Sequence, residues 1–142
     1  MRLCVLAAAL CLSFAASAAD RDYGSASVER VTSIYDGDTF RVDIAGWPSL
    51  IGSRVPIRLA GADTPEIRAH CAREKRLARQ AKQFTVSALR SGHNIQLRHM
   101  RRGKYFRIVA QVVIDGQRLA PRLIEAGLAN PYSGGHKAGW CP

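Results

Sequence analysis

The sequence predicts an α+β domain in which five strands form a small β-barrel and one long helix lies between the third strand and the fourth. Three features support this prediction: short apolar segments that alternate with polar residues, one long segment whose apolar residues have helical spacing, and turn-forming residues between these segments. Strands repeat with a period of two and helices with a period of 3.6, so the patterns give the order of the elements.

The first three strands are expected before residue 61. Residues 26–36 and 39–44 carry apolar and β-branched residues, and an Asp-Gly pair between them predicts a tight turn that joins two antiparallel strands. Glycine and proline in residues 46–52 predict a loop. Residues 54–60 then predict a third strand with a proline near its start, where the missing N–H is tolerated.

A long helix is expected over residues 67–90. Its apolar residues recur at helical spacing, and basic and acidic residues occupy much of the rest. The preceding segment 63–66, Asp-Thr-Pro-Glu, has the composition of a helix start, since it offers capping oxygens, a proline and an acid. A Ser-Gly pair at 91–92 predicts the end of this helix.

Two strands and a short helix complete the predicted fold. The strands are expected at 95–99 and 106–114 with a basic turn at 100–104 between them, and the helix at 119–126, with a glycine after its last residue. Residues 130–142 are expected to be ordered mainly by aromatic residues and a disulfide. Five strands with one helix between the third and fourth are typical of an OB-fold barrel, with that helix covering one end.

The N-terminal residues 1–18 have the pattern of a secretory signal peptide. An arginine at position 2 is followed by an apolar run from Leu3 to Ala16 and by small residues at the expected cleavage point after Ala18. A membrane anchor is the alternative, but this run is shorter than the about 20 residues that a spanning helix needs. We therefore expect an exported protein, periplasmic or secreted, whose residues 19–142 form one domain that is a monomer without membrane contact.

The cysteine count predicts one disulfide in the exported protein. Cys4 and Cys11 lie in the predicted leader, so only Cys71 and Cys141 remain afterwards. Two cysteines in an exported protein suggest one disulfide. This bridge would close a loop of about 70 residues and stabilise the fold by roughly 4 kcal/mol in the chain-entropy estimate. The spacing provides no tetrahedral zinc site.

The charge favours a polyanionic partner. The formal net charge is +10, which attracts phosphate-rich molecules. Charge alone does not distinguish DNA or RNA from anionic glycans or lipids, and it also serves solubility.

Three separated motifs combine acidic and basic residues: Asp36-Gly37-Asp38-Thr39, Arg58-Leu59-Ala60-Gly61-Ala62-Asp63-Thr64-Pro65-Glu66 and Lys104-Tyr105-Phe106-Arg107. In this order, and in the expected strand and helix context, these motifs resemble those of the staphylococcal nuclease (thermonuclease) family. The likeness extends from about residue 28 to residue 129.

The resemblance implies a divalent cation held by Asp38, Asp63 and the Thr64 main-chain carbonyl, with Asp36 in a supporting role. It favours calcium, with magnesium as an alternative. The chemistry is consistent, because carboxylates at the ends of neighbouring strands supply the oxygen ligands that these hard cations prefer. An Asp-Gly-Asp segment by itself is more often only a hairpin turn.

The resemblance also implies the catalytic groups. Glu66 would position or deprotonate the attacking water, and Arg58 and Arg107 would bind the phosphate, since guanidinium groups form bidentate contacts with phosphoryl oxygens. Lys104 and Tyr105 match positions that contact the nucleotide. The implied activity is hydrolysis of DNA or RNA with low sequence specificity, giving 3′-phosphorylated products.

The third motif departs from the family pattern. Phe106 stands where the family commonly has glycine, and Gly103 where it commonly has aspartate, which alters the turn that aims Arg107. A nucleic-acid-binding OB-type module with weak or no turnover is therefore the main alternative function. A cationic protein that acts on membranes or glycans is a third possibility, although it leaves the acidic residues unexplained.

Overall fold

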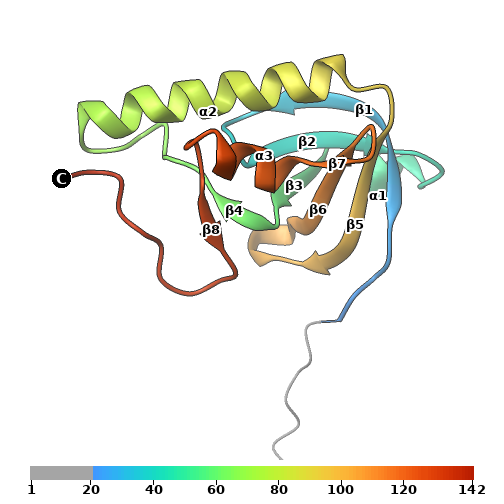
Figure 1. Ribbon diagram of the computed structural model, residues 1–142. Coiled ribbons are helices and arrows are strands. Elements are labelled where there is room, and N and C mark those ends of the chain that lie inside the picture. Colours follow the sequence, from blue (N-terminus) through green and yellow to red (C-terminus); the bar gives the residue numbers. More distant parts are fainter. Residues whose placement is uncertain (1–20) are drawn as a thin grey trace, which may run out of the picture.

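Residues 21–142 are described by the computed structural model (Figure 1). The predicted signal peptide lies outside these residues. Within them, no helix has the length and apolar character needed to cross a membrane.

A closed, five-stranded mixed β-barrel forms the centre of the molecule. The strands are hydrogen-bonded in the order β3-β2-β1-β5-β6, and a parallel pairing between β3 and β6 closes the ring. The other pairings in this ring are antiparallel. These strands are β1 (Ala26–Ile34), β2 (Thr39–Ile44), β3 (Val55–Leu59), β5 (Ile95–Arg102) and β6 (Ile108–Ile114).

The barrel interior holds the hydrophobic core, which includes Phe40, Ile57, Leu59 and Leu97, each at most 2% exposed. In β2 and β3 buried residues alternate with more exposed ones, as the period of a strand requires. The predicted α+β class and OB-fold-type barrel are confirmed, and so are the positions of the two predicted helices relative to the five barrel strands.

Three helices accompany the barrel. The longest, α2 (Ala72–Ser91), lies across one end of the barrel in Figure 1, and α3 (Leu119–Glu125) packs beside it. Helix α3 ends as predicted, because Gly127 has a positive φ of 69° and its N–H and that of Leu128 bond to carbonyls of the last turn. The short α1 (Ser49–Gly52) lies in the segment predicted as a loop.

Short elements lie around the barrel. The strands β4 (Gly61–Asp63) and β8 (Asn130–Tyr132) pair with each other, so the chain after α3 is held by backbone pairing as well as by the disulfide. The strand β7 (Gln117–Arg118) pairs with β6, and the 3-10 turn η1 (Lys104–Phe106) joins β5 to β6. Strand β5 is longer than predicted, because a bulge near His99 lets its pairing with β6 continue to Arg102.

The start of α2 differs from the prediction. The helix begins at Ala72 rather than at residue 67, and Cys71 is its N-cap residue, with Sγ 3.5 Å from the Glu74 N–H. Residues 63–66 do not start the helix, because Asp63 belongs to β4 and the Thr64 N–H bonds to the Asp38 carboxylate. Glu66 consequently lies in a turn ahead of the helix, outside its first turn.

Candidate active site

The turn between β1 and β2 places two buried carboxylates at one end of the barrel. Asp36 and Asp38 are both buried. The Asp38 main-chain N–H donates a hydrogen bond to Asp36 Oδ1 at 3.1 Å, and this bond closes a local turn of the kind that aspartate side chains favour. Asp36 therefore supports the conformation that presents Asp38.

Gly37 allows helix α2 to pack against this turn. A Cβ at residue 37 would lie 2.7 Å from Thr64 Cγ2 and 2.9 Å from Ala81 Cβ, which is too close for carbon atoms. The Gly37 carbonyl also accepts a hydrogen bond of 2.7 Å from the buried Thr85 hydroxyl. The Asp-Gly-Asp segment is thus more than a hairpin turn, because its glycine is required by close packing against the helix.

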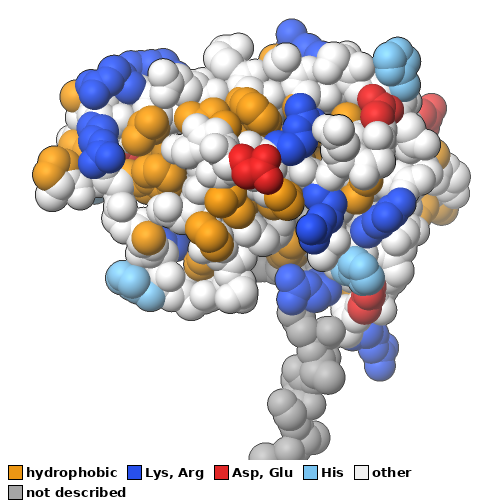
Figure 2. All heavy atoms as spheres, viewed as in Figure 1, with side chains coloured by type: hydrophobic (Ala, Val, Ile, Leu, Met, Phe, Trp, Pro, Cys, Tyr) orange, Lys and Arg blue, Asp and Glu red, His pale blue; other side chains and the backbone are white. Residues whose placement is uncertain are grey.

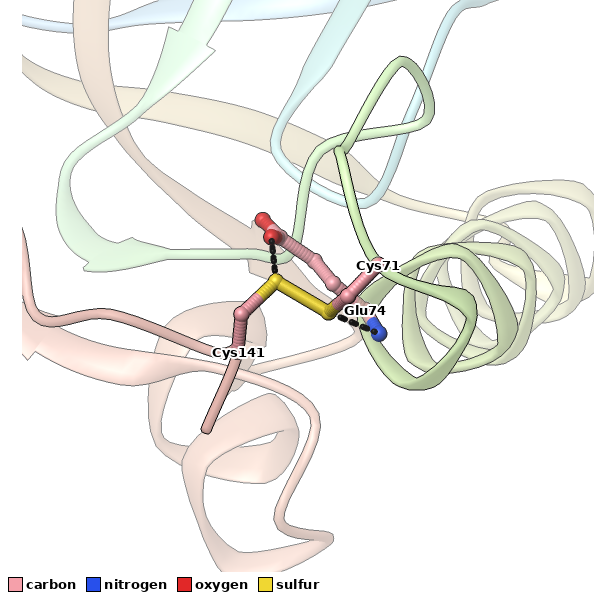
Figure 3. A group of neighbouring side chains, drawn as sticks. All are labelled: Cys71, Glu74 and Cys141. Carbon is pink, nitrogen blue, oxygen red and sulfur yellow. Dashed lines mark hydrogen bonds between the residues drawn. A yellow bond between two sulfur atoms is a disulfide. The ribbon is translucent and has the colours of Figure 1, made fainter.

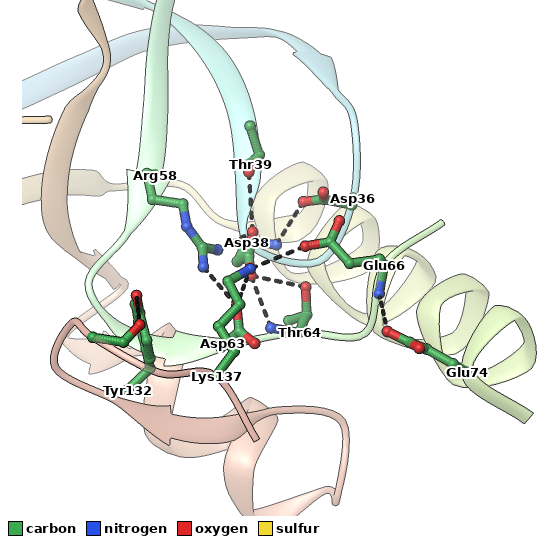
Figure 4. Close-up of polar contacts among 11 residues, drawn as sticks. Asp36, Asp38, Thr39, Arg58, Asp63, Thr64, Glu66, Glu74, Tyr132 and Lys137 are labelled. Atoms are coloured by element: carbon green, nitrogen blue, oxygen red, sulfur yellow. Dashed lines mark hydrogen bonds and ion pairs between the residues drawn. The ribbon is translucent and has the colours of Figure 1, made fainter. Parts of the chain in front are cut away.

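Arg58 lies between the two aspartates predicted to bind the cation (Figure 4). It sits on β3 opposite Thr39 of β2, and its guanidinium group forms ion pairs with Asp38 Oδ1 and, at 2.8 Å, with Asp63 Oδ1. Its side chain is only 14% exposed, so water screens these ion pairs weakly. Strand pairing therefore brings together charged residues that are far apart in the sequence.

Asp38 is the most heavily bonded acid of the site. Its Oδ2 accepts hydrogen bonds from the Thr64 N–H at 2.8 Å and from the Thr64 hydroxyl at 3.0 Å. Its Oδ1 accepts one from the Thr39 hydroxyl at 3.0 Å in addition to the Arg58 ion pair. Hydrogen bonds to a carboxylate favour its ionised form, which is the form that binds a cation.

A lysine from the C-terminal segment completes the site. Lys137 Nζ lies 2.8 Å from Asp63 Oδ1 and 3.0 Å from Glu66 Oε1 (Figure 4). Burial alone would lower the pKa of Lys137, but its hydrogen bonds to the two carboxylates outweigh burial and raise the pKa above its ordinary value. The ammonium group is therefore a positive charge bound between two acids.

The site carries more negative than positive charge. Four carboxylates face two cations, Arg58 and Lys137, which leaves a formal excess of two negative charges. Burial, followed by the nearby charge of Glu66, raises the pKa of the Asp36 carboxyl above its ordinary value. We call this group the acidic cluster; its carboxylates are those of Asp36, Asp38, Asp63 and Glu66.

The acidic cluster suits a divalent cation. Its donors are oxygen atoms, which hard cations such as Ca²⁺ and Mg²⁺ prefer. Lys137 shows that a cationic group fits between Asp63 and Glu66, and the excess negative charge matches a charge of two. The residues present therefore fit the predicted metal.

A disulfide fixes the segment that carries Lys137. Cys71 and Cys141 are bonded, with Cα atoms 6.0 Å apart, as predicted (Figure 3). Glu74 lies beside the bridge, and its Oε1 accepts a hydrogen bond of 3.1 Å from the Glu66 N–H. Because both sulfur atoms are in the disulfide, this Cys-Cys-Glu group provides no thiolate for a metal. The bridge instead places the tail next to the acidic cluster.

Arg107 lies apart from the acidic cluster. Among the described residues its guanidinium group contacts the Tyr105 ring, 5.7 Å from the centroid, and forms no ion pair with the four acids. Val109 of β6 pairs with Arg58 of β3, and Arg107 lies two positions before Val109. Arg107 itself precedes β6, which begins at Ile108, so it lies close along the chain to the residue that pairs with Arg58.

The turn before Arg107 is strained. Tyr105 and Phe106 have φ angles of 57° and 58°, in the left-handed region, which costs a residue with a side chain about 1 kcal/mol. Glycine would adopt this conformation freely at position 106. At position 103 glycine is required instead, because a Cβ there would lie 2.8 Å from Val109 Cγ2. The turn thus remains tight, but its glycine stands at position 103 and not at position 106, where the family commonly has one.

A hollow adjoins Arg58. It has a volume of about 390 Å³, and its lining includes Lys104, Tyr132 and Arg102. Lys104, predicted to bind the nucleotide, therefore faces the same space as Arg58. Tyr105 does not line this hollow; its ring is exposed at the tip of the hairpin. We call this space the first hollow.

The model of one protein family matches residues 56–138, more than half of the chain, and this family is described as staphylococcal nuclease homologue. The chain belongs to the staphylococcal nuclease homologue family. The match contains Arg58, Asp63, Glu66 and Arg107, and ends just after Lys137.

Three fungal proteins are among the relatives of this family member. The probable endonuclease LCL3 of Pyricularia oryzae is 32% identical over 124 residues, covering 72% of this chain and 48% of the fungal protein. The probable endonuclease lcl3 of Neosartorya fischeri is 36% identical over 131 residues, covering 72% and 44%. That of Penicillium rubens is 38% identical over 104 residues, covering 60% and 35%. The chain thus spans less than half the length of these relatives.

The structure brings together most of the residues predicted for the site and adds Lys137, which the sequence did not indicate. Six predicted residues lie together in the structure, whereas Arg107 and Tyr105 lie on the β5–β6 hairpin outside the ion-pair network. Lys137 was missed because it lies in a Gly-rich tail that follows no periodic pattern, four residues before Cys141. The residues brought together are Asp36, Asp38, Arg58, Asp63, Thr64 and Glu66.

Proposed function

We propose that the protein is an exported, divalent-cation-dependent nuclease that hydrolyses DNA or RNA with low sequence specificity. The observation that carries this proposal is the acidic cluster, in which Arg58 and a tail ammonium group lie among four carboxylates. Membership of the staphylococcal nuclease homologue family and the names of the fungal relatives support it. The disulfide is consistent with an oxidising compartment, periplasmic or extracellular.

The metal would be held by Asp38 and Asp63 together with the Thr64 main-chain carbonyl, with Asp36 fixing the turn. Oxygen ligands suit both calcium and magnesium, and the resemblance to the family favours calcium, with magnesium as the alternative. When bound, the cation would neutralise negative charge on the phosphate. It would compete with Lys137 for Asp63 Oδ1, so we expect the ammonium group to move away when the cation binds.

The chain's own groups would perform the remaining steps. Glu66 is 56% exposed at its side chain, so it can reach a water molecule and accept the proton that water loses as its oxygen attacks phosphorus. Arg58 would bind a phosphoryl oxygen from the side of the acidic cluster, and Arg107 from the hairpin, where both stabilise growing charge. The bond from phosphorus to the 5′ oxygen breaks, and this oxygen takes up a proton from solvent and leaves as a 5′-hydroxyl. The upstream fragment keeps the phosphate on its 3′ oxygen.

The substrate would lie along the first hollow, with Lys104 contacting the nucleotide there and Tyr105 reaching it from the tip of the hairpin. Contacts to phosphates carry no sequence information, so low specificity and strong salt dependence follow. Basic side chains are spread over the face seen in Figure 2, which gives a general attraction for a polyanion. We expect the protein to act as a monomer.

Cleavage of single-stranded DNA by residues 19–142, in the presence of calcium, magnesium or EDTA, tests this proposal. Glu66→Gln removes the proton acceptor at nearly constant shape, and Glu125→Gln is its control, because Glu125 is an exposed acid on α3. We expect calcium-dependent cleavage with 3′-phosphate ends that is lost in the first variant only. Salt-sensitive binding without cleavage under any metal would favour the binding module, and 5′-phosphate ends would contradict the assigned leaving group.

A further inference from the structure

A second hollow adjoins the β5–β6 hairpin, and neither Arg58 nor the acidic cluster lines it. Its volume is about 630 Å³, larger than the first hollow, and it lies between helix α1 and the hairpin. Trp47, Leu50 and Ile51 line it from the segment that joins β2 to β3, and Phe106 and Arg107 line it from the hairpin.

Large apolar side chains are left uncovered around this second hollow. Leu50 is 95% exposed and Phe106 is 87% exposed, and Trp47 and Ile51 are also open to solvent. Isolated exposed apolar residues are common, but a group of them around a concavity marks a binding surface. These side chains contribute little to the hydrophobic core, so a ligand is the better explanation for their grouping.

The backbone at Phe106 supports this explanation. Its φ of 58° is unfavourable for a residue with a side chain, yet the ring is solvent-exposed and not packed in the core. Strain that no packing of the fold repays is typical of functional positions. The strained turn holds the Phe106 ring at the rim of the second hollow.

Charge indicates the kind of ligand. Arg101, Arg102 and Arg107 line the second hollow, and Arg101 and Arg102 also line the first hollow beside Arg58. The two hollows therefore share two arginines of the hairpin. Arginines beside exposed aromatic rings suit a ligand that carries both phosphates and flat bases.

We propose that the second hollow is a binding subsite for single-stranded nucleic acid, in which bases stack on Phe106 and Trp47 while a phosphate binds Arg102. This subsite rests on the proposed nuclease function, since it extends the path of the strand from the first hollow across the hairpin. Stacking accepts any base, so the subsite strengthens binding without adding sequence preference.

Trp47 provides a direct probe of this subsite. The chain has two tryptophans, Trp47 and Trp140, so Trp140→Phe leaves Trp47 as the only indole. In EDTA, which prevents metal-dependent cleavage, this protein is titrated with a ten-nucleotide oligothymidylate and with an abasic oligomer of the same length. The two oligomers carry the same phosphates, so any difference between them reports on the bases.

We expect oligothymidylate to quench Trp47 and to bind about tenfold more tightly than the abasic oligomer, the size that one stacked base provides. Phe106→Gly removes the ring and relieves the strained backbone, so its melting temperature should not fall, while its preference for oligothymidylate should become smaller than that of the parent protein. Phe106→Tyr keeps a ring and should keep the preference. Equal binding of the two oligomers by the parent protein would overturn the subsite.

Two other ligands of this surface would also overturn the proposal. One is a membrane, shown by binding to anionic phosphatidylglycerol vesicles that Phe106→Gly abolishes while oligomer binding is unchanged. The other is a second copy of the chain, shown by a dimer in sedimentation that the same substitution dissociates. Metal-dependent cleavage without a base preference would contradict the subsite but not the nuclease function. A base preference without cleavage would contradict the nuclease function but not the subsite.

Discussion

The acidic cluster and the β5–β6 hairpin carry the two arginines of the proposed phosphate site in opposite surroundings. Arg58 is largely buried and paired with Asp38 and Asp63, which themselves are fixed by strand pairing and threonine hydrogen bonds. Arg107 lies after a strained turn beside two exposed aromatic rings. One region is held by the fold, and the other is presented to solvent.

Because of this difference, substitutions in the acidic cluster should change both stability and activity, whereas substitutions on the hairpin should change binding or turnover alone. A buried, paired charge cannot be removed without leaving its partners unpaired, so a change in the acidic cluster alters folding as well as activity. Residues on the exposed hairpin have few partners within the fold, and their loss should be measurable as a change in binding or turnover alone. The following substitutions test that distinction, from the largest expected effect to the smallest.

Removing the disulfide should have the largest effect on stability. Cys71→Ser with Cys141→Ser opens a loop with a sequence separation of 70 residues, and we expect the free energy of unfolding to fall by about 4 kcal/mol. Denaturant unfolding followed by circular dichroism measures this change, with the single variant Cys71→Ser under reducing conditions as control. A loss below about 1 kcal/mol would show that the tail is held mainly by the β4–β8 pairing.

The second largest effect on stability should come from Arg58, and Arg107 should differ from it clearly. Arg58→Ala leaves two buried carboxylates without their guanidinium partner, so we expect a loss of about 3 kcal/mol in unfolding free energy. Arg107→Ala should change that energy by less than about 0.5 kcal/mol and yet lower turnover by at least about 100-fold.

Unfolding and cleavage measured on the same two preparations compare these arginines. Equal losses of stability would contradict the contrast between the acidic cluster and the hairpin. Full activity of Arg107→Ala would remove Arg107 from the site.

Lys137→Met tests whether the tail ammonium group competes with the cation. The variant removes a positive charge 2.8 Å from Asp63 Oδ1, so we expect calcium to bind about tenfold more tightly, or about 1.4 kcal/mol. Calorimetric titration measures the affinity, and Lys75→Met on the exposed face of α2 is the control. Unchanged or weaker binding would show that Lys137 does not compete for the acids.

Asp115, which belongs neither to the acidic cluster nor to the β5–β6 hairpin, should make a small pH-dependent contribution to stability. The N–H groups of Asn94 and then His93 donate to its carboxylate and hold the pKa of Asp115 below its ordinary value. A folded-state pKa below the unfolded value gives stability that is present above about pH 4 and lost as pH falls through the folded pKa. Asp115→Asn should therefore flatten the stability profile below about pH 4, and an unaltered profile would exclude this contribution.

The sequence predicted the barrel and most of the acidic cluster for physical reasons that act locally. Strand periodicity and the Asp-Gly turn specify β1 and β2, and motif residues lie at the ends of strands that pairing must bring together. The start of α2 was predicted too early, because residues 63–66 carry helix-capping groups that β4 pairing and Asp38 use instead.

Contacts between distant segments account for what the sequence did not predict. Lys137 reaches the acidic cluster only because the disulfide and β8 direct the tail towards it. The second hollow depends on where α1 lies relative to the hairpin, and residues 46–52 contain no pattern that specifies this position. Likewise, the geometry of the hairpin imposes the left-handed backbone conformation of Phe106, although this conformation is unfavourable for a residue with a side chain.

Calcium titration of residues 19–142 by calorimetry, with Asp38→Asn beside Asp43→Asn, tests the central claim most directly. Both aspartates belong to the β2 region, but Asp43 pairs with Arg30, outside the acidic cluster. The account predicts one calcium site in the parent protein and in Asp43→Asn, and a loss of affinity of at least about tenfold in Asp38→Asn. No calcium or magnesium binding by the parent, or equal binding by all three proteins, would contradict the assignment of the acidic cluster as a metal site.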